Sequence, residues 1–118
     1  MITQEKGRIA EEQALAYLVA QGFKPITQNY HCKLGEIDLI MRDGDYLVFV
    51  EVRARVSMAF GGGIASITYA KTQKIIKSAT YYLMTHKEWK QLYPRFDIIS
   101  IDGKSASITW IKDAFSVD

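Results

Sequence analysis

GEIDLIMRDGDYLVFVEVRAR, residues 35–55, is the segment that decides the fold, because it has the pattern of a β-hairpin. Two runs of branched and aromatic residues, EIDLIM (36–41) and YLVFVEVRA (46–54), are typical of strands. The turn-rich sequence RDGD lies between them, where a hairpin would reverse direction. We therefore predict two antiparallel strands in this segment.

The charged residues of this predicted hairpin gather on one face. Side chains alternate along a strand, so Glu36 and Asp38 share a face of the first strand. Glu51, Arg53 and Arg55 likewise share a face of the second strand. If the turn is centred on its Gly-Asp pair, Asp38 lies opposite Glu51 and Glu36 lies opposite Arg53. A register shifted by two residues would leave them diagonal neighbours, whereas a slip of one residue would separate them.

Two carboxylates that face each other need a compensating interaction. Like charges about 4 Å apart repel by roughly 4 kcal/mol at an effective dielectric constant of about 20. A shared proton, a neighbouring arginine or a divalent cation can each offset that repulsion. In a simpler interpretation, Arg53 and Arg55 neutralise a polar end of the sheet. The hairpin alone leaves these alternatives open.

The rest of the chain predicts helices and strands around this hairpin. Residues 5–21 have an apolar stripe at helical spacing, with Gly22 where a helix would end. Residues 68–87 predict a second helix, ended by the Tyr-Pro sequence that follows. Further strands are predicted at 23–30, 95–101 and 106–111, and AFGGGI at 59–64 predicts a flexible break. The order αβββαββ predicts an α/β fold with one mixed β-sheet flanked by helices.

Glu11 is the unusual residue of the first predicted helix. It lies on the same stripe as Ala14 and Leu18, so an acid is expected to face the sheet. A glutamate can also extend to the rim of an apolar face, and a small change of helix register would move it. Taken together, Glu11, Asp38 and Glu51 predict three carboxylates around one point, which is an arrangement suited to Mg²⁺ or Mn²⁺.

The bulk properties fit one globular domain over residues 1–118. Hydrophobic residues make up 48% of the chain and charged residues 24%, and the net charge of +2 is too small to indicate a polyanionic partner by itself. Cys32 is the only cysteine, which excludes an internal disulfide and fits a reducing compartment. The chain has neither a signal peptide nor the roughly 20 apolar residues of a membrane span, so we expect a cytoplasmic protein without a membrane partner.

Motifs along nearly the whole chain resemble one known family. They are Gly7, Glu11, Ala14, Leu18, Gly22, Asn29, GEIDLIMRDG, VFVEVRAR, FGGG, Lys71, RFDII and the terminal WIKDAF. This combination is similar to the YraN-like proteins of bacteria, which are assigned to the PD-(D/E)XK superfamily of restriction-endonuclease-like nucleases. The resemblance implies a restriction-endonuclease-like sheet. It makes Asp38 and Glu51 the two metal-binding acids and puts Arg53 at the usual lysine position. Glu11 is similar to the helix acid of archaeal Holliday-junction resolvases.

The activity implied by this resemblance is metal-dependent hydrolysis of phosphodiester bonds in DNA, including branched or flapped DNA. It implies Mg²⁺ or Mn²⁺ held by Asp38, Glu51 and Glu11, with Arg53 as a further catalytic residue. Arginine stays protonated, so Arg53 can clamp a phosphate but cannot act as a general base. The alternative is a catalytically inactive module that binds nucleic acid or a protein partner on the same scaffold. Related resolvases act as dimers, which adds a homodimer to the expectations.

Basic residues near the hairpin and the second predicted helix are candidates for binding a DNA backbone. They are Arg42, Arg55, Lys71 and Lys74, with Arg53 and Lys77 beside them. Lysines about three residues apart on a helix are also typical of an ordinary solvated face. The sequence leaves both interpretations open.

Two further acids have less definite expectations. Glu36 either binds a metal through a water or pairs with Arg53 or Arg55, and pairing is favoured. Asp97 interrupts the apolar strand RFDIISI, where we expect a structural rather than a catalytic role.

Overall fold

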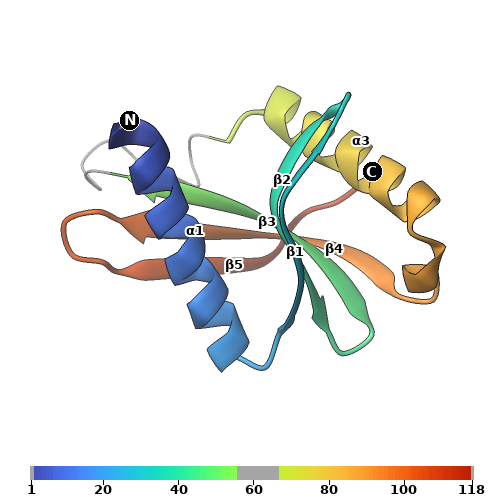
Figure 1. Cartoon of the computed structure of the whole chain (residues 1–118), viewed down its shortest axis with the longest axis horizontal. Coiled ribbons are helices and arrows are strands. Elements are labelled where there is room, and N and C mark those ends of the chain that lie inside the picture. The colour runs from blue at the N-terminus through green and yellow to red at the C-terminus, as the bar shows by residue number, and fades with distance from the viewer. Residues whose placement is uncertain (1, 56–66, 118) are drawn as a thin grey trace.

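A computed structural model describes residues 2–55 and 67–117 of the chain. Its elements are α1 (Ile2–Ala20), β1 (Lys24–Cys32), β2 (Gly35–Asp43), β3 (Tyr46–Arg55), α3 (Tyr69–Thr85), the 3₁₀ helix η2 (Lys87–Trp89), β4 (Tyr93–Asp102) and β5 (Ile108–Phe115). The predicted order αβββαββ is confirmed (Figure 1). The predicted break at 59–64 lies outside the described residues.

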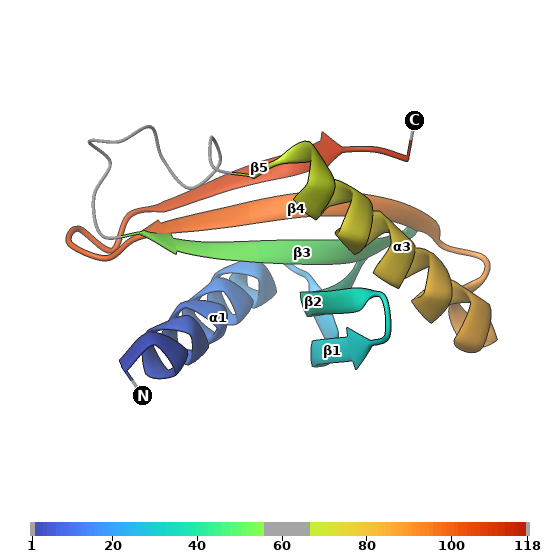
Figure 2. The ribbon, with the colours of Figure 1, turned by 90° about the horizontal axis from the view of Figure 1, so that it is seen from above.

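The described strands form one sheet of five, in the order β1-β2-β3-β4-β5. β3 and β4 are parallel, and the other neighbours are antiparallel, so the sheet is mixed as predicted. A parallel pair needs a crossover connection, and α3 lies in the chain between β3 and β4. The β1–β2 end curls away from β3–β5 on the side where α1 lies (Figure 2). This curl separates β2 from β3 at one end.

The two helices pack against opposite faces of the sheet. Alternation along β3 directs Val48 and Val50 into the core beneath α1, and Leu47 and Phe49 into the core beneath α3. The helices contribute Ala10, Ala14 and Leu18 from α1, and Ile75, Ile76, Ala79 and Tyr82 from α3. Within residues 2–55 and 67–117, neither helix combines the length and apolarity that a bilayer crossing needs.

α1 ends in the glycine cap that its sequence predicts. Gly22 has φ of 101°, and its N–H donates to the carbonyl of Val19 at 2.9 Å. The N–H of Phe23 donates to the carbonyl of Leu18 at 3.0 Å. This pair of bonds satisfies carbonyls that the helix end would leave open, and it directs the buried Phe23 back onto the helix.

The Tyr-Pro sequence does not end the second helix, contrary to the prediction. α3 ends at Thr85, and Tyr93 and Pro94 are the first residues of β4. Proline is tolerated at the beginning of a strand, where its missing N–H removes little of the ladder. β5 also runs to Phe115, beyond its predicted end at 111.

Candidate active site

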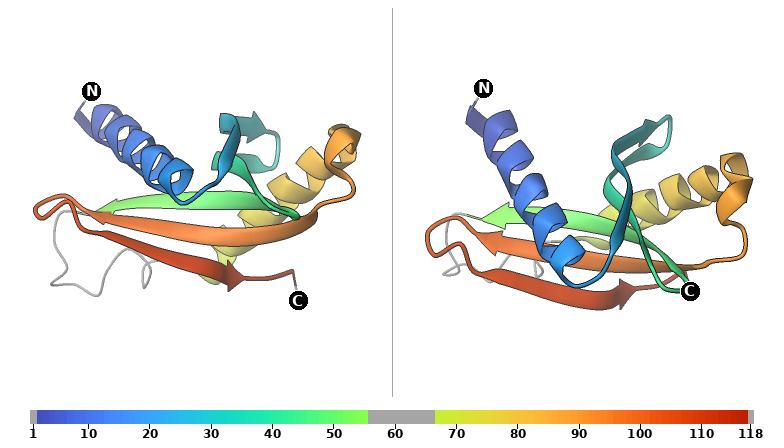
Figure 3. Two further views of the ribbon diagram at one scale, coloured as in Figure 1. Left: turned by 90° about the horizontal axis from the view of Figure 1, so that it is seen from below. Right: turned by 60° about the horizontal axis from the view of Figure 1, so that its bottom comes forward.

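The β2–β3 hairpin opens into a fork in which Asp38 is held. The two strands pair in the predicted register from their turn as far as Leu39 and Val50. β2 then leaves β3 and pairs with β1 alone, and the hairpin end stands away from the rest of the sheet (Figure 3). Inside the fork, the carboxylate of Asp38 accepts a hydrogen bond of 2.8 Å from the backbone N–H of Val52. The side chain thus takes the place of a strand partner and is fixed against β3.

Asp38 and Glu51 form a pair of interacting carboxyl groups. The Glu51 side chain is 6% exposed. Burial, together with the negative charge of Asp38, raises the pKa of Glu51 to about 7. Burial also raises the pKa of Asp38, although the Val52 N–H and a hydrogen bond with Glu51 lower it. With a pKa of about 7, Glu51 is still partly protonated near neutral pH, and a proton on the pair is one of the ways to offset the predicted repulsion.

Two cations contact the carboxyl group of Glu51. Its Oε2 lies 3.4 Å from Nη1 of Arg53 and 3.7 Å from Nζ of Lys71. Arg53 comes from the same face of β3, as strand alternation predicts. Lys71 comes from the first turn of α3, where the side chain of Thr68 accepts a hydrogen bond of 3.1 Å from the Lys71 backbone N–H. This N-cap fixes the helix start, and with it the lysine, beside the sheet.

Glu11 approaches the pair from α1 and interacts with Asp38. Burial and the charge of Asp38 raise the pKa of Glu11, whereas a hydrogen bond with the Asn29 side chain lowers it. Asn29 has φ of 53°, a left-handed conformation that asparagine tolerates better than most residues. Sequence reasoning found Asn29 only as part of a motif. The contact between Asn29 and Glu11 depends on this left-handed backbone conformation, which the spacing of residues in the sequence does not reveal.

The acids form a chain of contacts rather than a closed cage. Within residues 2–55 and 67–117, no three His, Cys, Asp or Glu side chains are grouped so that they could hold a metal ion. Instead, Asp38 interacts with Glu11 on one side and with Glu51 on the other. Mg²⁺ is commonly held by one or two protein carboxylates, with water and phosphate oxygens in its other positions. The two carboxyl groups of Asp38 and Glu51 fit such an ion.

Glu36 has a different partner from the one expected. β2 has already left β3 at this position, so Glu36 lies opposite His31 of β1 instead of opposite Arg53. Its Oε2 forms an ion pair of 3.3 Å with Nδ1 of His31. Both side chains are more than half exposed, so the pair belongs to the surface of the hairpin end.

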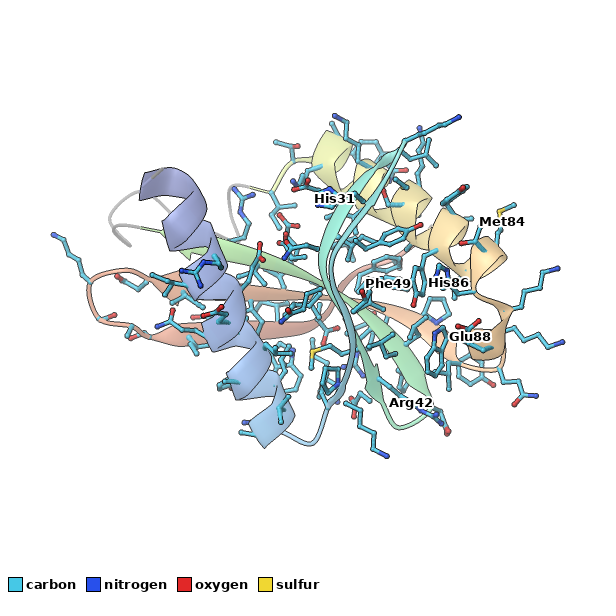
Figure 4. All side chains as sticks on the ribbon, viewed as in Figure 1. His31, Arg42, Phe49, Met84, His86 and Glu88 are labelled. Carbon is cyan, nitrogen blue, oxygen red and sulfur yellow. The ribbon has the colours of Figure 1, made fainter. Side chains whose placement is uncertain are left out.

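The remaining predicted basic residues lie outside the fork. Arg42 is near the β2–β3 turn, where its Nε donates to the carbonyl of Gly44 at 2.9 Å. Figure 4 shows Arg42 at the opposite end of the paired strands β1 and β2 from His31. Lys74 is exposed on α3, one turn after Lys71. The side chain of Arg55 is outside the described part of the structure.

The fold and the acid pair define an α/β protein with a paired-carboxyl site in a strand fork. The chain belongs to the uncharacterised protein family UPF0102, whose model matches residues 10–101. This is the family that the motifs indicated under the name YraN. The matched range contains Glu11, Asp38, Glu51 and Lys71, so the whole candidate site lies inside the region that defines the family.

Relatives are similar over almost the full length of the chain. A UPF0102 protein of Legionella pneumophila (strain Philadelphia 1) is 60% identical, and the alignment covers 97% of each chain. One from Psychromonas ingrahamii is 51% identical over 96% of this chain and 91% of the relative. One from Saccharophagus degradans is 47% identical over 97% and 95%. The similarity therefore extends beyond the site to all the elements that position it.

Proposed function

We propose that the protein is a metal-dependent endonuclease that hydrolyses phosphodiester bonds in DNA, with branched or flapped DNA as the substrate class. The observation that carries the proposal is the pair of carboxyl groups, Asp38 and Glu51, held in the β2–β3 fork beside two cations. Perturbed pKa values of this kind cluster at functional sites, because burying acids together costs free energy that a purely structural sheet avoids. The resemblance to PD-(D/E)XK nucleases supplies the reaction class.

Asp38 and Glu51 would hold the ion, which we propose to be Mg²⁺ or Mn²⁺, and Glu11 adjoins Asp38. When bound, such an ion polarises a phosphate oxygen and increases the acidity of a water molecule. Glu51 must lose its proton to act as a ligand, and its pKa of about 7 places that loss near neutral pH. The affinity for the ion is therefore expected to rise as the pH passes through this range.

Arg53 and Lys71 would hold the substrate. Both contact Glu51, and both lower its pKa by placing positive charge beside it. A phosphodiester that enters the fork brings negative charge to the same two cations, and the guanidinium of Arg53 can bind two phosphate oxygens at once. Arg53 remains protonated, so it orients and neutralises charge but does not remove a proton from water.

The DNA backbone would extend from the fork along α3. Lys74 and Lys77 are exposed on this helix, which begins beside Glu51 with Lys71. Lysines on one helix can follow a line of phosphates without reading the base sequence. A homodimer would match the two-fold character of a DNA junction. Arg42, at the far end of the hairpin, would contact only DNA that also reaches the β2–β3 turn.

A catalytically inactive DNA-binding module is the second candidate. Two observations favour it: Arg53 occupies the position where the related nucleases have lysine, and the described residues contain no group of three metal ligands. Such a module would keep the basic residues of the fork and α3 for binding. It would differ from the enzyme in leaving the DNA backbone intact.

Cleavage assays distinguish the two candidates. The full chain would be incubated with linear duplex, single-stranded, flapped and four-way DNA, with Mg²⁺, with Mn²⁺ or with a chelator. An endonuclease cleaves in a metal-dependent way, and both Asp38→Asn and Glu51→Gln abolish cleavage. Glu36→Gln is the matched control, because it removes an exposed acid of the same hairpin that pairs with His31. This control is expected to retain activity.

Arg53→Lys tests whether the arginine limits the reaction. This substitution places lysine, the residue found in the related nucleases, at position 53. If the native site is active, the Arg53→Lys protein should cleave DNA at least as fast as the native chain. DNA binding without cleavage by either form, in the presence or absence of a divalent ion, would establish the inactive module. Cleavage that persists in both the Asp38→Asn and Glu51→Gln proteins would show that the acid pair is not the active site.

A further inference from the structure

A pocket lies where the chain leaves α1 and where β2 turns into β3. Its volume is about 250 Å³, and it is lined by Gly22, Lys24, Arg42 and Gly44. All four residues are exposed, so a ligand can reach the pocket from solution. Figure 1 shows the α1–β1 connection and the β2–β3 turn together at the bottom of the view. The pocket shares no residue with the acid pair of the fork or its two cations.

Two positive charges are held side by side at this pocket. Lys24 of β1 and Arg42 of β2 are cross-strand partners, so their side chains leave the same face of the sheet. Like charges directly opposite each other destabilise a pair of strands. Within residues 2–55 and 67–117, neither side chain forms an ion pair, and the adjacent Asp43 is paired with Arg95 at 3.0 Å. An anion between the two cations would remove their repulsion.

The guanidinium of Arg42 is already fixed at the mouth of the β2–β3 turn. Its Nε donates to the carbonyl of Gly44 at 2.9 Å. Its other two nitrogens, Nη1 and Nη2, make no hydrogen bond with any residue that the structure describes. A guanidinium held in this way can donate to two oxygens of one phosphate, with little further loss of side-chain freedom.

The two glycines keep the pocket open. Gly22 has φ of 101° and Gly44 has φ of 60°, and a Cβ atom at either position would meet no atom within 4 Å. Backbone without side chains lets a phosphate group come close to the peptide N–H groups. Among the described residues, none with an aromatic or apolar side chain lines the pocket. The pocket therefore suits a phosphate group and has no surface on which a base could stack.

The distance to the fork favours DNA as the source of that phosphate. Asp38 and Arg42 are four positions apart in β2, which corresponds to at most about 14 Å of strand. About four base pairs of a duplex have this length along the helix axis. One DNA molecule that lies along β2 can therefore reach both places, whereas a free phosphate ion would gain nothing from their proximity.

We propose that Lys24 and Arg42 form a second phosphate-binding subsite, which takes a backbone phosphate of the DNA whose other phosphate enters the fork. Arg42 donates two hydrogen bonds to the phosphate, and Lys24 contributes a point charge from the neighbouring strand. The identity of the DNA ligand rests on the proposed function, whereas the pocket and its two cations do not. The subsite sets the direction of the DNA backbone along β2 and reads no base sequence.

The salt dependence of DNA binding tests the subsite without requiring cleavage. Fluorescence anisotropy would follow the full chain on a labelled duplex of about ten base pairs, in chelator, from about 50 to about 200 mM salt. Lys24→Gln combined with Arg42→Gln should weaken binding several-fold. It should also reduce the slope of log K against log salt by about 1, because one phosphate contact is lost. Both side chains are exposed, so the double variant should melt no lower than the native chain.

Two further proteins serve as controls. Lys104→Gln combined with Lys112→Gln removes the same charge from exposed positions of the β4–β5 hairpin and should keep the native slope. Lys24→Arg combined with Arg42→Lys keeps both charges at the pocket and should bind with nearly the native slope. Inorganic phosphate, followed through the amide NMR signals of Gly22 and Gly44, provides the arm without DNA.

The outcomes separate the subsite from the nuclease proposal. A double variant that binds DNA with the native affinity and slope would overturn the subsite, even if the native chain cleaves DNA. Phosphate that shifts the two glycine signals while the DNA slope is unchanged in the double variant would mark a site for free phosphate, which also overturns the proposal. A native chain that binds no DNA would overturn the subsite and the proposed function together.

Discussion

Glu51 shows how one residue can be predicted from the sequence while its state cannot. Its place on the same face as Arg53 follows from strand alternation alone. Its protonation state does not follow from the sequence. It depends on how deeply Glu51 is buried, and the residue is only 5% exposed because α3 packs over β3. Lys71, which also contacts the carboxyl group of Glu51, lies in a different element, α3. The sequence therefore identifies the acid, and the tertiary structure sets its pKa.

Glu51→Gln should change how stability depends on pH. The pKa of Glu51 is about 7 in the folded state and 4.5 in its ordinary state, so the folded chain keeps a proton that the unfolded chain has lost. This group therefore lowers the free energy of unfolding as the pH rises between those values, by at most about 3 kcal/mol. Glutamine cannot ionise.

Urea unfolding across this pH range measures the effect. The variant should gain stability relative to the native chain as the pH increases, with little difference below the ordinary pKa of glutamate. A difference between the two proteins that does not vary with pH would contradict the raised pKa.

Asp97 is a buried acid in the middle of β4 that joins this strand to β5. It is fully buried and accepts hydrogen bonds from Nε and Nη2 of Arg95, from the indole of Trp110 and from the backbone N–H of Asp113. These contacts agree with the structural role expected for it. The sequence could not name the partners, because Trp110 and Asp113 reach Asp97 only through the irregular pairing of β5.

Asp97→Ala should destabilise the protein by about 3–5 kcal/mol, because the buried guanidinium of Arg95 loses two hydrogen bonds and keeps only Asp43 as a carboxylate partner. Chemical denaturation gives the loss directly. Arg95→Met combined with Asp97→Leu should lose less than the sum of the two single changes, since it removes both charges. Strict additivity would show that the two residues do not act as a pair.

At the scale of elements, the hairpin was predicted correctly near its turn and incorrectly at its open end. Alternation and the RDGD turn give the register as far as Leu39 and Val50. The expectation that Glu36 would face Arg53 assumed that the ladder continues. The expectation is wrong because β2 also pairs with β1, and at its open end it pairs with β1 alone. The local sequence does not show which of two neighbouring strands a residue will pair with.

Gly35→Ala should destabilise the contact between the β1–β2 turn and α3. Gly35 has φ of 150°, and an added Cβ would meet Ser78 Oγ at 3.0 Å, so we expect a loss of about 1–3 kcal/mol. Adding Ser78→Ala should recover the steric part of that loss. Both are measured by thermal unfolding.

Gly7→Ala is the matched control for this substitution. Gly7 lies in α1 with open space around the position of a Cβ, so alanine should stabilise the helix by up to about 1 kcal/mol. If both glycine substitutions had the same effect, the close approach at Gly35 would not be what constrains the turn.

At the scale of the whole molecule, the candidate site joins four separate segments. Glu11 comes from α1, Asp38 from β2, Glu51 from β3 and Lys71 from α3. Residue patterns could find each of these positions, because each breaks the local pattern or belongs to a motif. They could not find how far the acids converge, since that depends on the curl of the hairpin and on the packing angle of α1.

Divalent cations should stabilise the native chain. An ion that binds only the folded state raises the melting temperature, and Mg²⁺ or Mn²⁺ should do so more strongly above the pKa of Glu51 than below it. Calorimetry with each ion and with a chelator measures this, and the Asp38→Asn protein should show no response. A native chain whose melting temperature is the same in all conditions would rule out the proposed metal site.

The parallel pairing of β3 with β4 has a consequence for synthesis on the ribosome. Tyr46 of β3 pairs with Tyr93 of β4, and residues 56–92, nearly a third of the chain, separate the two strands. At about 5–20 residues per second, β3 waits for several seconds with one open edge, the kind of surface that recruits other nascent chains. Because β4 follows α3 in the chain, the open edge of β3 is covered only after the whole of α3 has been synthesised.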